Sequence, residues 1–422
     1  MNIENLSNYE FWTEELLEQF IYDYANYSAE DILEIIKKLN KEYPPKDVLK
    51  ELLDRRSAIQ ENQKIKNLLK NLKDPYPKTI KLSEIKNKSV DLSSIAIVLT
   101  AGGDGERLMQ SLKNEGKTEE EIKNFTKATI PLPGFADDKS TLEINLRLIQ
   151  KLEESLSITI PVIVTLGPIG SKTAELIPKF LKENENFDLK KLITVPQFKR
   201  IHFSNEEKIV LDKNLNIITN PDETGGPIVR LKYPILKNEE TGIEWLKNNG
   251  VNHVLILQAI GLYDFEIIKK IVSQKNKADL IALGIIRKEF RENDYFGTFI
   301  YLNDNEKRRL KILESHVIDE NIRSIKNNEE EFLPYNPGLY LFEISLIDNI
   351  NEIPFYASSD KEIKDGVEKA PKIGFAATDL TLIAKNPKIL LIDNLNFSSL
   401  IKDYESLKEV SEFRKKHNLE II

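Results

Sequence analysis

Ile95-Ala-Ile-Val-Leu-Thr-Ala-Gly-Gly-Asp-Gly-Glu-Arg-Leu108 is the stretch that decides the fold. Its first six residues carry no charge and are rich in β-branched types, which predicts a buried strand. Three glycines follow within four positions, and glycine lets a backbone adopt positive φ and approach a ligand closely. Successive N–H groups in such a turn can surround a phosphate, and Arg107 adds a permanent charge. The alternative is a tight turn between a strand and a helix with solvated charges.

This stretch resembles the L-x-G-G-x-G-T-R-L signature of the UDP-sugar pyrophosphorylases, a family of nucleotidyltransferases that make nucleotide sugars. Glu106 stands where that family usually has threonine or serine. Lys127 resembles the lysine of the family's following P-K motif, although the next two residues depart from it. The insertion between the two motifs, residues 110–126, is polar and charged, and it predicts a mobile loop over the site.

Composition bounds the classes of protein to consider. A chain of 422 residues is long enough for one large domain with appendages or for two domains. Apolar residues make up 41% and charged residues 30%, which is typical of a globular protein in water. The net charge of −8 is spread along the chain without a basic stripe, which argues against nucleic acid as a partner. The absence of cysteine excludes disulfides, thiolate metal sites and thiol nucleophiles.

The sequence carries no signal for a membrane or for secretion. No uncharged run reaches the roughly 18 residues that a membrane span needs. The first residues lack a basic region followed by an apolar one. Together with the absence of cysteine, this leads us to expect a cytoplasmic protein without a membrane partner.

The spacing of apolar residues predicts an α/β fold with an N-terminal helical extension. Residues 1–73 read as helices, because apolar residues recur there at three- and four-residue spacing. From Ile95 onward, short apolar strands alternate with helical runs, which indicates an α/β domain with a mostly parallel sheet. The resemblance implies a Rossmann-like, GT-A-like nucleotidyltransferase domain over residues 74–403, followed by a C-terminal helix at 404–422.

Two more segments resemble parts of the family's uridine site. Gln197 resembles the glutamine of an F-x-Q segment, with a solvated loop residue as the alternative. Asn220-Pro-Asp-Glu-Thr-Gly-Gly-Pro227 resembles the P-x-G-x-G loop that closes over the uracil base, with an ordinary turn as the alternative. The nucleotide-binding residues that the resemblance implies are Ala101, Gly102, Gly103, Gly105, Gln197, Gly225 and Gly226.

Two later segments resemble the family's sugar site. Glu314 follows Lys-Ile-Leu and matches an acidic residue that hydrogen-bonds sugar hydroxyls. Asn336 lies in a segment that resembles the family's N-x-G-x-Y-x-F strand, which places it toward the sugar. An amide and a carboxylate suit hydroxyl groups, which both donate and accept hydrogen bonds. A purely structural role is the alternative for each residue.

The segment 389–402 resembles the family's strand and E-F-S-P-L-K-N motif. Phe397, Ser398 and Leu400 carry the match, and the lysine is displaced by one position, to Lys402. In the family that lysine contacts phosphate. The segment points toward the UDP-N-acetylhexosamine pyrophosphorylase branch.

Magnesium is the cofactor that the resemblance implies, and the sequence departs from the family where the ion is held. The family has an aspartate at the end of its central strand, where Ile260 is expected to sit in this chain. Isoleucine cannot ligate a hard cation, which needs oxygen ligands. Asp264 either substitutes for that aspartate or caps a helix. Asp379 matches a second magnesium aspartate of related enzymes, with a helix cap as the alternative.

The implied reaction is uridylyl transfer from UTP to a sugar 1-phosphate, of glucose or N-acetylglucosamine, with release of pyrophosphate. The resemblance assigns Arg107 to the β- and γ-phosphates, Lys127 to the α-phosphate and Lys402 to the sugar phosphate. One alternative is a nucleotide-sugar binding or regulatory protein that lost its metal site. A dinucleotide oxidoreductase fits less well, because the acidic residues 119–121 lie in a polar segment and not at a strand end.

Overall fold

The computed structural model contains two compact units, each assembled from segments that are distant in the sequence. The N-terminal unit comprises Met1–Asn71, Phe198–Gly226 and Pro354–Ala376, and the sheet unit comprises Leu72–Gln197, Pro227–Ile353 and Ala377–Ile422. The structure describes residues 3–86, 90–103, 105–135, 139–184, 191–236, 238–289, 297–304, 307–364, 368–393, 398–417 and 419. The predicted domain boundaries at residues 73 and 403 stay a prediction.

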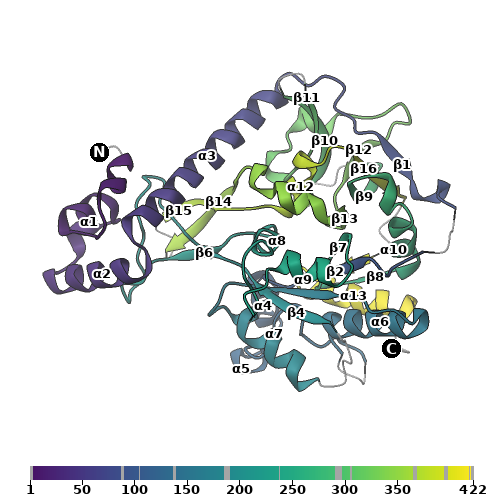
Figure 1. Ribbon diagram of the computed structural model, residues 1–422, viewed down its shortest axis with the longest axis horizontal. Coiled ribbons are helices and arrows are strands. Elements are labelled where there is room, and N and C mark those ends of the chain that lie inside the picture. Colours follow the sequence, from purple (N-terminus) through teal and green to yellow (C-terminus); the bar gives the residue numbers. More distant parts are fainter. Residues whose placement is uncertain are drawn as a thin grey trace. The chain divides into compact units, whose positions relative to one another are not determined.

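One large sheet organises the sheet unit (Figure 1). Its strand order is β11-β10-β12-β9-β13-β7-β2-β3-β4, with β16 beside β9 and β1 beside β16. The strands are β1 (Thr79–Lys81), β2 (Ile95–Thr100), β3 (Val162–Leu166), β4 (Leu192–Pro196), β7 (His253–Gln258), β9 (Leu280–Arg287), β10 (Thr298–Asp304), β11 (Lys307–Leu313), β12 (Phe332–Tyr335), β13 (Tyr340–Glu343) and β16 (Pro387–Ile392). The strands β4, β3, β2 and β7 run parallel, whereas β13 runs antiparallel to both β7 and β9.

Amphipathic helices accompany these strands. They are α4 (Glu106–Asn114), α5 (Glu119–Ile122), α6 (Thr141–Leu156), α7 (Lys172–Glu183), α9 (Gly242–Asn248), α10 (Phe265–Val272), α11 (Glu320–Arg323), α12 (Leu380–Ile383) and α13 (Tyr404–Lys416). Helix α6 begins after Ser140, whose side chain accepts a hydrogen bond from the N–H of Glu143 at 3.3 Å. Its buried face, with Leu142, Leu146 and Ile149, joins the core formed by the central strands. A short antiparallel pair, β8 (Gly261–Tyr263) and β17 (Ser398–Leu400), leads into α13.

The insertion after the glycine loop is helical, so the prediction of a mobile loop over residues 110–126 is wrong. Helix α4 continues through Asn114, and α5 begins with a capping box formed by Thr118 and Glu121. Leu112 and Ile122 are buried in an apolar cluster that includes residues of α13. Burial of these two side chains against a helix from the other end of the chain explains why a polar sequence folds here.

In the described residues, three α-helices and two antiparallel strand pairs form most of the N-terminal unit. They are α1 (Glu14–Phe20), α2 (Ala29–Glu42), α3 (Pro45–Leu69), the pair β5 (Lys199–Ile201) and β6 (Thr219–Pro221), and the pair β14 (Tyr356–Lys364) and β15 (Glu368–Gly374). Leu17, Ile35 and Leu52 of the helices share one apolar cluster with Ile201 and Phe203. This shared core explains why a segment from the middle of the chain belongs to the N-terminal helices.

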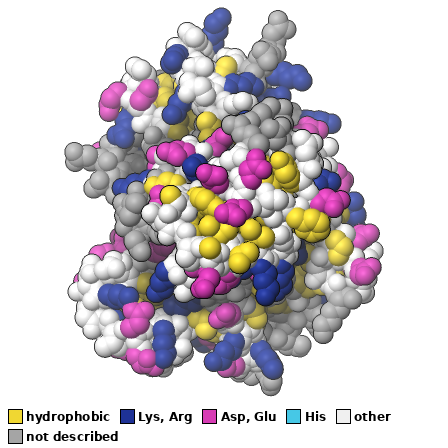
Figure 2. All heavy atoms as spheres, turned by 90° about the vertical axis from the view of Figure 1, so that its left-hand side faces the viewer, with side chains coloured by type: hydrophobic (Ala, Val, Ile, Leu, Met, Phe, Trp, Pro, Cys, Tyr) yellow, Lys and Arg dark blue, Asp and Glu magenta, His cyan; other side chains and the backbone are white. Residues whose placement is uncertain are grey.

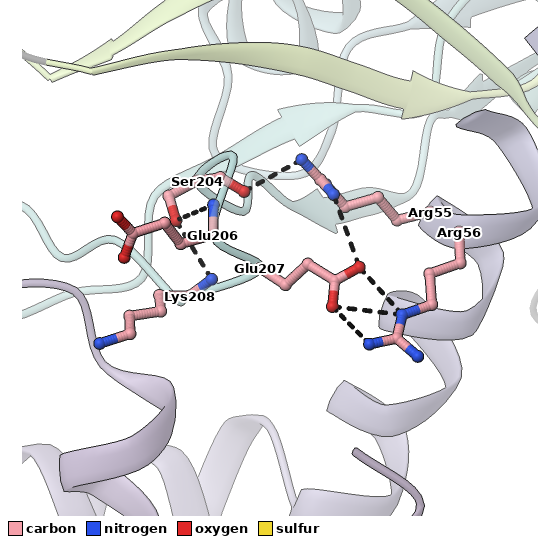
Figure 3. Close-up of polar contacts among 6 residues, drawn as sticks. All are labelled: Arg55, Arg56, Ser204, Glu206, Glu207 and Lys208. Carbon is pink, nitrogen blue, oxygen red and sulfur yellow. Dashed lines mark hydrogen bonds and ion pairs between the residues drawn. The ribbon is translucent and has the colours of Figure 1, made fainter. Parts of the chain in front are cut away.

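Charged contacts add to this apolar core, as Figure 3 shows. Arg56 of α3 holds the carboxylate of Glu207, with 2.6 Å between Nη2 and Oε2. The neighbouring Arg55 is 3% exposed and donates to the carbonyl oxygen of Ser204 at 3.0 Å. These bonds fix the turn at residues 204–208 to the helix.

Figure 2 looks at the side of the molecule that carries α1 and α2 and shows hydrophobic side chains near the middle of that face, with charged side chains around them. Among the exposed large hydrophobic residues are Phe11, at 63%, and Leu33, at 68%. Single exposed apolar residues of this kind are common on folded proteins. Within the described part of the chain, no helix combines the length and the apolar character needed to cross a membrane.

Candidate functional site

The carboxyl ends of four neighbouring parallel strands meet at one edge of the large sheet, which we call the carboxyl edge. Thr100 of β2 stands opposite Thr165 of β3 and Gln258 of β7, and Thr165 in turn stands opposite Val195 of β4. Ligands of α/β sheets bind outside the carboxyl ends of parallel strands. The glycine loop begins at Ala101, directly after β2, and therefore leaves the sheet at this edge.

Packing and backbone conformation explain two of the loop's glycines. Ala101 donates its N–H to the carbonyl oxygen of Thr165 at 3.2 Å, which fixes the start of the loop to β3. A Cβ on Gly102 would lie 2.8 Å from Oε1 of Gln197, so these two predicted nucleotide-binding residues are in contact. Gly105 has a φ of +77°, which side chains disfavour, and it immediately precedes α4.

Gly103 differs from its neighbours, because no heavy atom of the described chain lies within 4 Å of a Cβ built on it. The packing of the chain therefore does not require glycine at this position. A ligand that approaches the backbone closely, as predicted for this loop, would require glycine at this position.

Three cations gather beside the glycine loop. Cγ of Lys127 lies 3.3 Å from the position that a Cβ on Gly105 would take. Burial and the positive charges of Lys402 and Arg107 lower the pKa of Lys127 to about 8. The carboxylate of Asp403 offsets part of this effect. Like charges held this close repel each other, and a bound anion would relieve the repulsion.

Lys402 reaches this cluster from near the end of the chain. It follows β17, and its N–H donates to Oγ of Ser406 in the first turn of α13 at 2.6 Å. The residue is exposed to solvent, and partial desolvation lowers the pKa of Lys402. Arg107 lowers that pKa further, whereas Glu314 raises it. The predicted phosphate-binding cations and a predicted sugar-binding carboxylate therefore influence one another.

A buried tyrosine lies near both predicted sugar-binding residues. Asn336 donates from Nδ2 to the hydroxyl of Tyr340 at 2.6 Å, and its Oδ1 accepts the N–H of Gly338 at 3.0 Å. Burial raises the pKa of Tyr340, and the charge of Glu314 contributes in the same direction. Asn336 therefore shapes the turn before β13 with the same amide that was predicted to face the sugar.

Strand β7 ends at Gln258. Ile260, which the resemblance places at the position of a magnesium aspartate, lies two residues beyond this strand end. Ile260 instead packs, partly buried, against the apolar core. Nε2 of Gln258 donates to the carbonyl oxygen of Pro337 at 3.1 Å, so the glutamine supports the turn that carries Asn336. A neutral amide supplies no negative charge to a cation.

The two candidate metal aspartates have other partners. Asp379 is 1% exposed, and its carboxylate accepts a hydrogen bond from the ammonium of the buried Lys311. It makes no cap bond to α12, which excludes the helix-cap alternative. Asp264 accepts the N–H of Glu266 at 2.9 Å and so caps α10.

These contacts bear on the magnesium prediction. Within the described residues, no group of three or more His, Cys, Asp or Glu could hold a metal ion. Magnesium takes six oxygen ligands in a nearly ideal octahedron. The described residues do not fit a magnesium site of their own, and the cofactor stays a prediction.

The second glycine pair belongs to the N-terminal unit. Gly225 donates its N–H to the carbonyl oxygen of Phe375 at 2.6 Å. A Cβ on Gly226, where α8 (Gly226–Arg230) begins, would lie 1.9 Å from Oδ1 of Asp222. Both glycines are therefore required by the packing of their own loop. Their predicted contact with uracil stays a prediction.

Asp222 is a buried acid at the base of this loop. It is fully buried, and its Oδ1 accepts the N–H of Phe198 at 3.2 Å. Its carbonyl oxygen accepts the N–H of Phe375 at 3.0 Å. Burial raises the pKa of Asp222 to about 7, although the charge of Arg200 acts in the opposite direction. This acid therefore changes its protonation state near neutral pH.

The sequence reading missed several of these residues. Lys311 could have been noticed, because it sits among apolar residues of a strand and faces inward with Leu313 by alternation. Gln258 could have been noticed as a polar side chain within an apolar run, although it does not mark the end of that run. Phe397, which carries part of the late motif, lies outside the described residues.

Comparison with known proteins identifies the fold. No protein-family model matches the sequence, and no curated protein matches it. The solved structure of UDP-N-acetylglucosamine pyrophosphorylase from Trypanosoma brucei with an inhibitor matches with a TM-score of 0.69 and 15% identity, over 92% of this chain and 79% of that one. UDP-glucose phosphorylase from Trypanosoma brucei matches with a TM-score of 0.63 and 13% identity, over 90% and 78% of the two chains.

A third solved structure agrees with these two. A mutant of UDP-glucose pyrophosphorylase from Leishmania major in complex with UDP-glucose matches with a TM-score of 0.59 and 12% identity, over 83% of this chain and 77% of that one. The chain therefore has the fold of UDP-sugar pyrophosphorylases. The α/β nucleotidyltransferase-like fold predicted from the glycine loop is confirmed.

Proposed function

We propose that this protein is a nucleotidyltransferase that transfers the uridylyl group of UTP to a sugar 1-phosphate. A phosphate oxygen of the sugar attacks the α-phosphorus of UTP in line with the leaving group. The bond from the α-phosphorus to the bridging oxygen breaks, and pyrophosphate leaves with its electron pair. The products are a UDP-sugar and pyrophosphate. The reaction needs no protein nucleophile, because alignment and neutralisation of charge suffice.

The observation that carries the proposal is the convergence of Arg107, Lys127 and Lys402 beside the glycine loop. These residues come from separate parts of the chain, and the sequence predicts a phosphate-binding role for each of them. Mutual repulsion of the cations makes the cluster costly without a ligand, and the substrates carry several negative charges between them. Each of the three cations would attract an anion that is bound here.

The roles proposed for individual residues follow from this cluster of cations. Arg107 is proposed to bind the β- and γ-phosphates, Lys127 the α-phosphate and Lys402 the sugar phosphate. Three positive groups around the reacting phosphorus would stabilise the charge of the transition state more than that of the ground state. The proposed uridine and sugar contacts are the main chain of Ala101, Gly102 and Gly103, the turn at Gly105, the side chain of Gln197, the loop at Gly225 and Gly226, and the polar groups of Glu314 and Asn336.

The sugar is proposed to be N-acetylglucosamine or glucose. The late motif at 389–402 favours the N-acetylhexosamine branch. Magnesium is included in the assays below because UTP is handled as its magnesium salt, but no step is assigned to a protein-bound ion.

Pyrophosphate release tests the proposal directly. The full chain is assayed with UTP, magnesium and either glucose 1-phosphate or N-acetylglucosamine 1-phosphate, and pyrophosphate is measured continuously. We expect release with at least one sugar, and a loss of about 100-fold in kcat/KM for Lys402→Ala. Lys408→Ala, a change on the same segment at a lysine that pairs with Glu405, is the matched control and should keep full activity.

The second candidate is a nucleotide-sugar binding protein without turnover. Gln258 at the strand end and the pairing of Asp379 with Lys311 favour it, because neither offers a free carboxylate to a metal. If no sugar 1-phosphate supports pyrophosphate release from UTP while calorimetry detects binding of a UDP-sugar to the protein, the transferase proposal fails and the binding function replaces it.

A further inference from the structure

A groove of about 520 Å³ lies in the sheet unit away from the glycine loop. Its walls are the segments at the starts of β1 and β16 and the hairpin of β10 and β11, which Figure 1 shows in the upper part of the sheet unit. The volume falls within the range of small-molecule sites. The groove is lined by Lys78, Thr79, Ile80, Tyr301, Arg308, Arg309, Leu310 and residues 384–389.

The groove's charge is of one sign. Five of its lining residues are lysine or arginine, and none is aspartate or glutamate. Arg308 is neutralised, because its Nη2 lies 2.8 Å from a carboxylate oxygen of Asp74, and its guanidinium covers the ring of Tyr301 at 4.1 Å. Within the described part of the chain, the other four basic side chains have no carboxylate within 4.0 Å; they are Lys78, Arg309, Lys385 and Lys388.

The backbone that presents these cations is held in place. The N–H groups of Lys385 and Asn386 donate to the carboxylate of Asp279 at 2.6 and 3.0 Å. The N–H of Tyr301 donates to the carbonyl oxygen of Pro75 at 2.8 Å, which ties the segment before β1 to the hairpin. A site whose walls are already ordered loses less entropy when a ligand binds.

The groove is separate from the candidate active site. Strands β7 and β9 both run antiparallel to β13 and therefore point the same way, and β16 runs parallel to β9. The glycine loop lies at carboxyl ends, whereas β1 and β16 contribute their amino ends to the groove. No residue predicted for the nucleotide, the sugar or the metal lines it.

We propose that this groove is a second anion site, and that it binds a small molecule carrying two or more linked phosphate groups. Four cations in one groove, three from the β1 and β16 segments and one from the hairpin, match several negative charges better than one. Arginine also binds phosphate oxygens through its fork of N–H groups. The volume excludes a long polyanion from full burial but accommodates a diphosphate or triphosphate. This inference does not depend on the proposed reaction.

Inorganic pyrophosphate is the probe, and calorimetry on the full chain is the measurement. Binding is recorded at constant ionic strength in Lys127→Gln/Lys402→Gln, which weakens the candidate active site. In that background, Arg309→Gln/Lys385→Gln removes two cations from the groove. Both side chains are exposed, so the fold should tolerate the change, and a thermal melt checks this.

The control has the same change of charge elsewhere. Lys269→Gln/Lys270→Gln alters the last turn of α10, outside the groove. We expect pyrophosphate affinity to fall at least tenfold in the groove variant and less than twofold in the control. Unchanged affinity in the groove variant would overturn the proposal, and so would an equal fall in the control, because that result would mean general attraction to surface charge.

Discussion

Replacing Lys127 by glutamine should remove activity and yet raise stability. The ammonium of Lys127 is held among other cations and partly buried, which lowers its pKa from 10.5 to about 8. At 1.36 kcal/mol for each pH unit, keeping it charged costs the folded state about 3 kcal/mol at neutral pH. Glutamine has a similar length and no charge, so Lys127→Gln should be more stable by about 1 to 3 kcal/mol at pH 7.

The pH dependence gives a second signature of the same effect. Because the folded pKa lies below the unfolded one, the unfolded chain binds more protons between about pH 8 and pH 10.5. The wild type should therefore gain stability as the pH rises through this window. Lys127→Gln should lack that gain, since it has no ammonium to discharge.

Urea unfolding at pH 7, 8, 9 and 10 measures both effects. The control is Lys179→Gln, at a side chain that is 67% exposed in a surface pair with Glu183, and it should change stability by less than about 0.5 kcal/mol. A Lys127→Gln protein that is less stable than wild type, with the same dependence on pH, would refute the argument. So would a variant that keeps its turnover.

Three further changes test other parts of the structure. The wild type should lose stability as the pH rises from about 4 to 7, because the folded pKa of the buried Asp222 is raised to about 7, and Asp222→Asn should abolish this loss. If unfolding experiments show the same loss in the variant, another group causes it. Gly102→Ala should lower the free energy of unfolding by about 1 to 3 kcal/mol, because its Cβ would lie 2.8 Å from an amide oxygen. Gly103→Ala meets no neighbour within 4 Å and should lower it by less than about 0.5 kcal/mol, and equal losses of stability in the two variants would contradict the packing. Lys311→Met should lower the free energy of unfolding by about 3 to 5 kcal/mol, because it leaves Asp379 charged and unpaired. Adding Asp379→Leu should restore more than half of this loss, and a double variant that recovers no stability in urea unfolding would show that the broken pair does not cause the loss.

Local sequence patterns were sufficient to predict the strand β2 and the glycine turn before α4. A strand followed by three glycines and Arg107 has few folded solutions, since a contact explains Gly102 and a positive φ explains Gly105. Lys127 and Lys402 could be named only through the resemblance to a family. Nothing in their own neighbourhoods indicates that residues 275 positions apart would share one electrostatic environment.

The strand end at Gln258 could not be fixed from the sequence. The run continues with Ala259 and Ile260, which are as apolar as the strand itself, so the hydrophobic pattern carries no mark at the point where pairing stops. At the strand end, the side chain of Gln258 donates to the turn before β13, and that turn is almost 80 residues away in the sequence.

Long-range packing also explains the other differences between the predicted and the observed structure. The segment 110–126 looks like a loop because its residues are mostly polar, and it becomes two helices because Leu112 and Ile122 are buried against α13. Ile201 and Phe203 joined the core of the N-terminal helices for a similar reason. Such contacts link parts of the chain whose separation leaves no local pattern.

Isotope exchange tests the central claim most directly. Labelled pyrophosphate, magnesium and a UDP-sugar are incubated with the full chain, and label in UTP is measured. The account predicts labelled UTP that depends on UDP-N-acetylglucosamine or UDP-glucose and disappears in Lys402→Ala. Binding of a UDP-sugar without any label in UTP would contradict it.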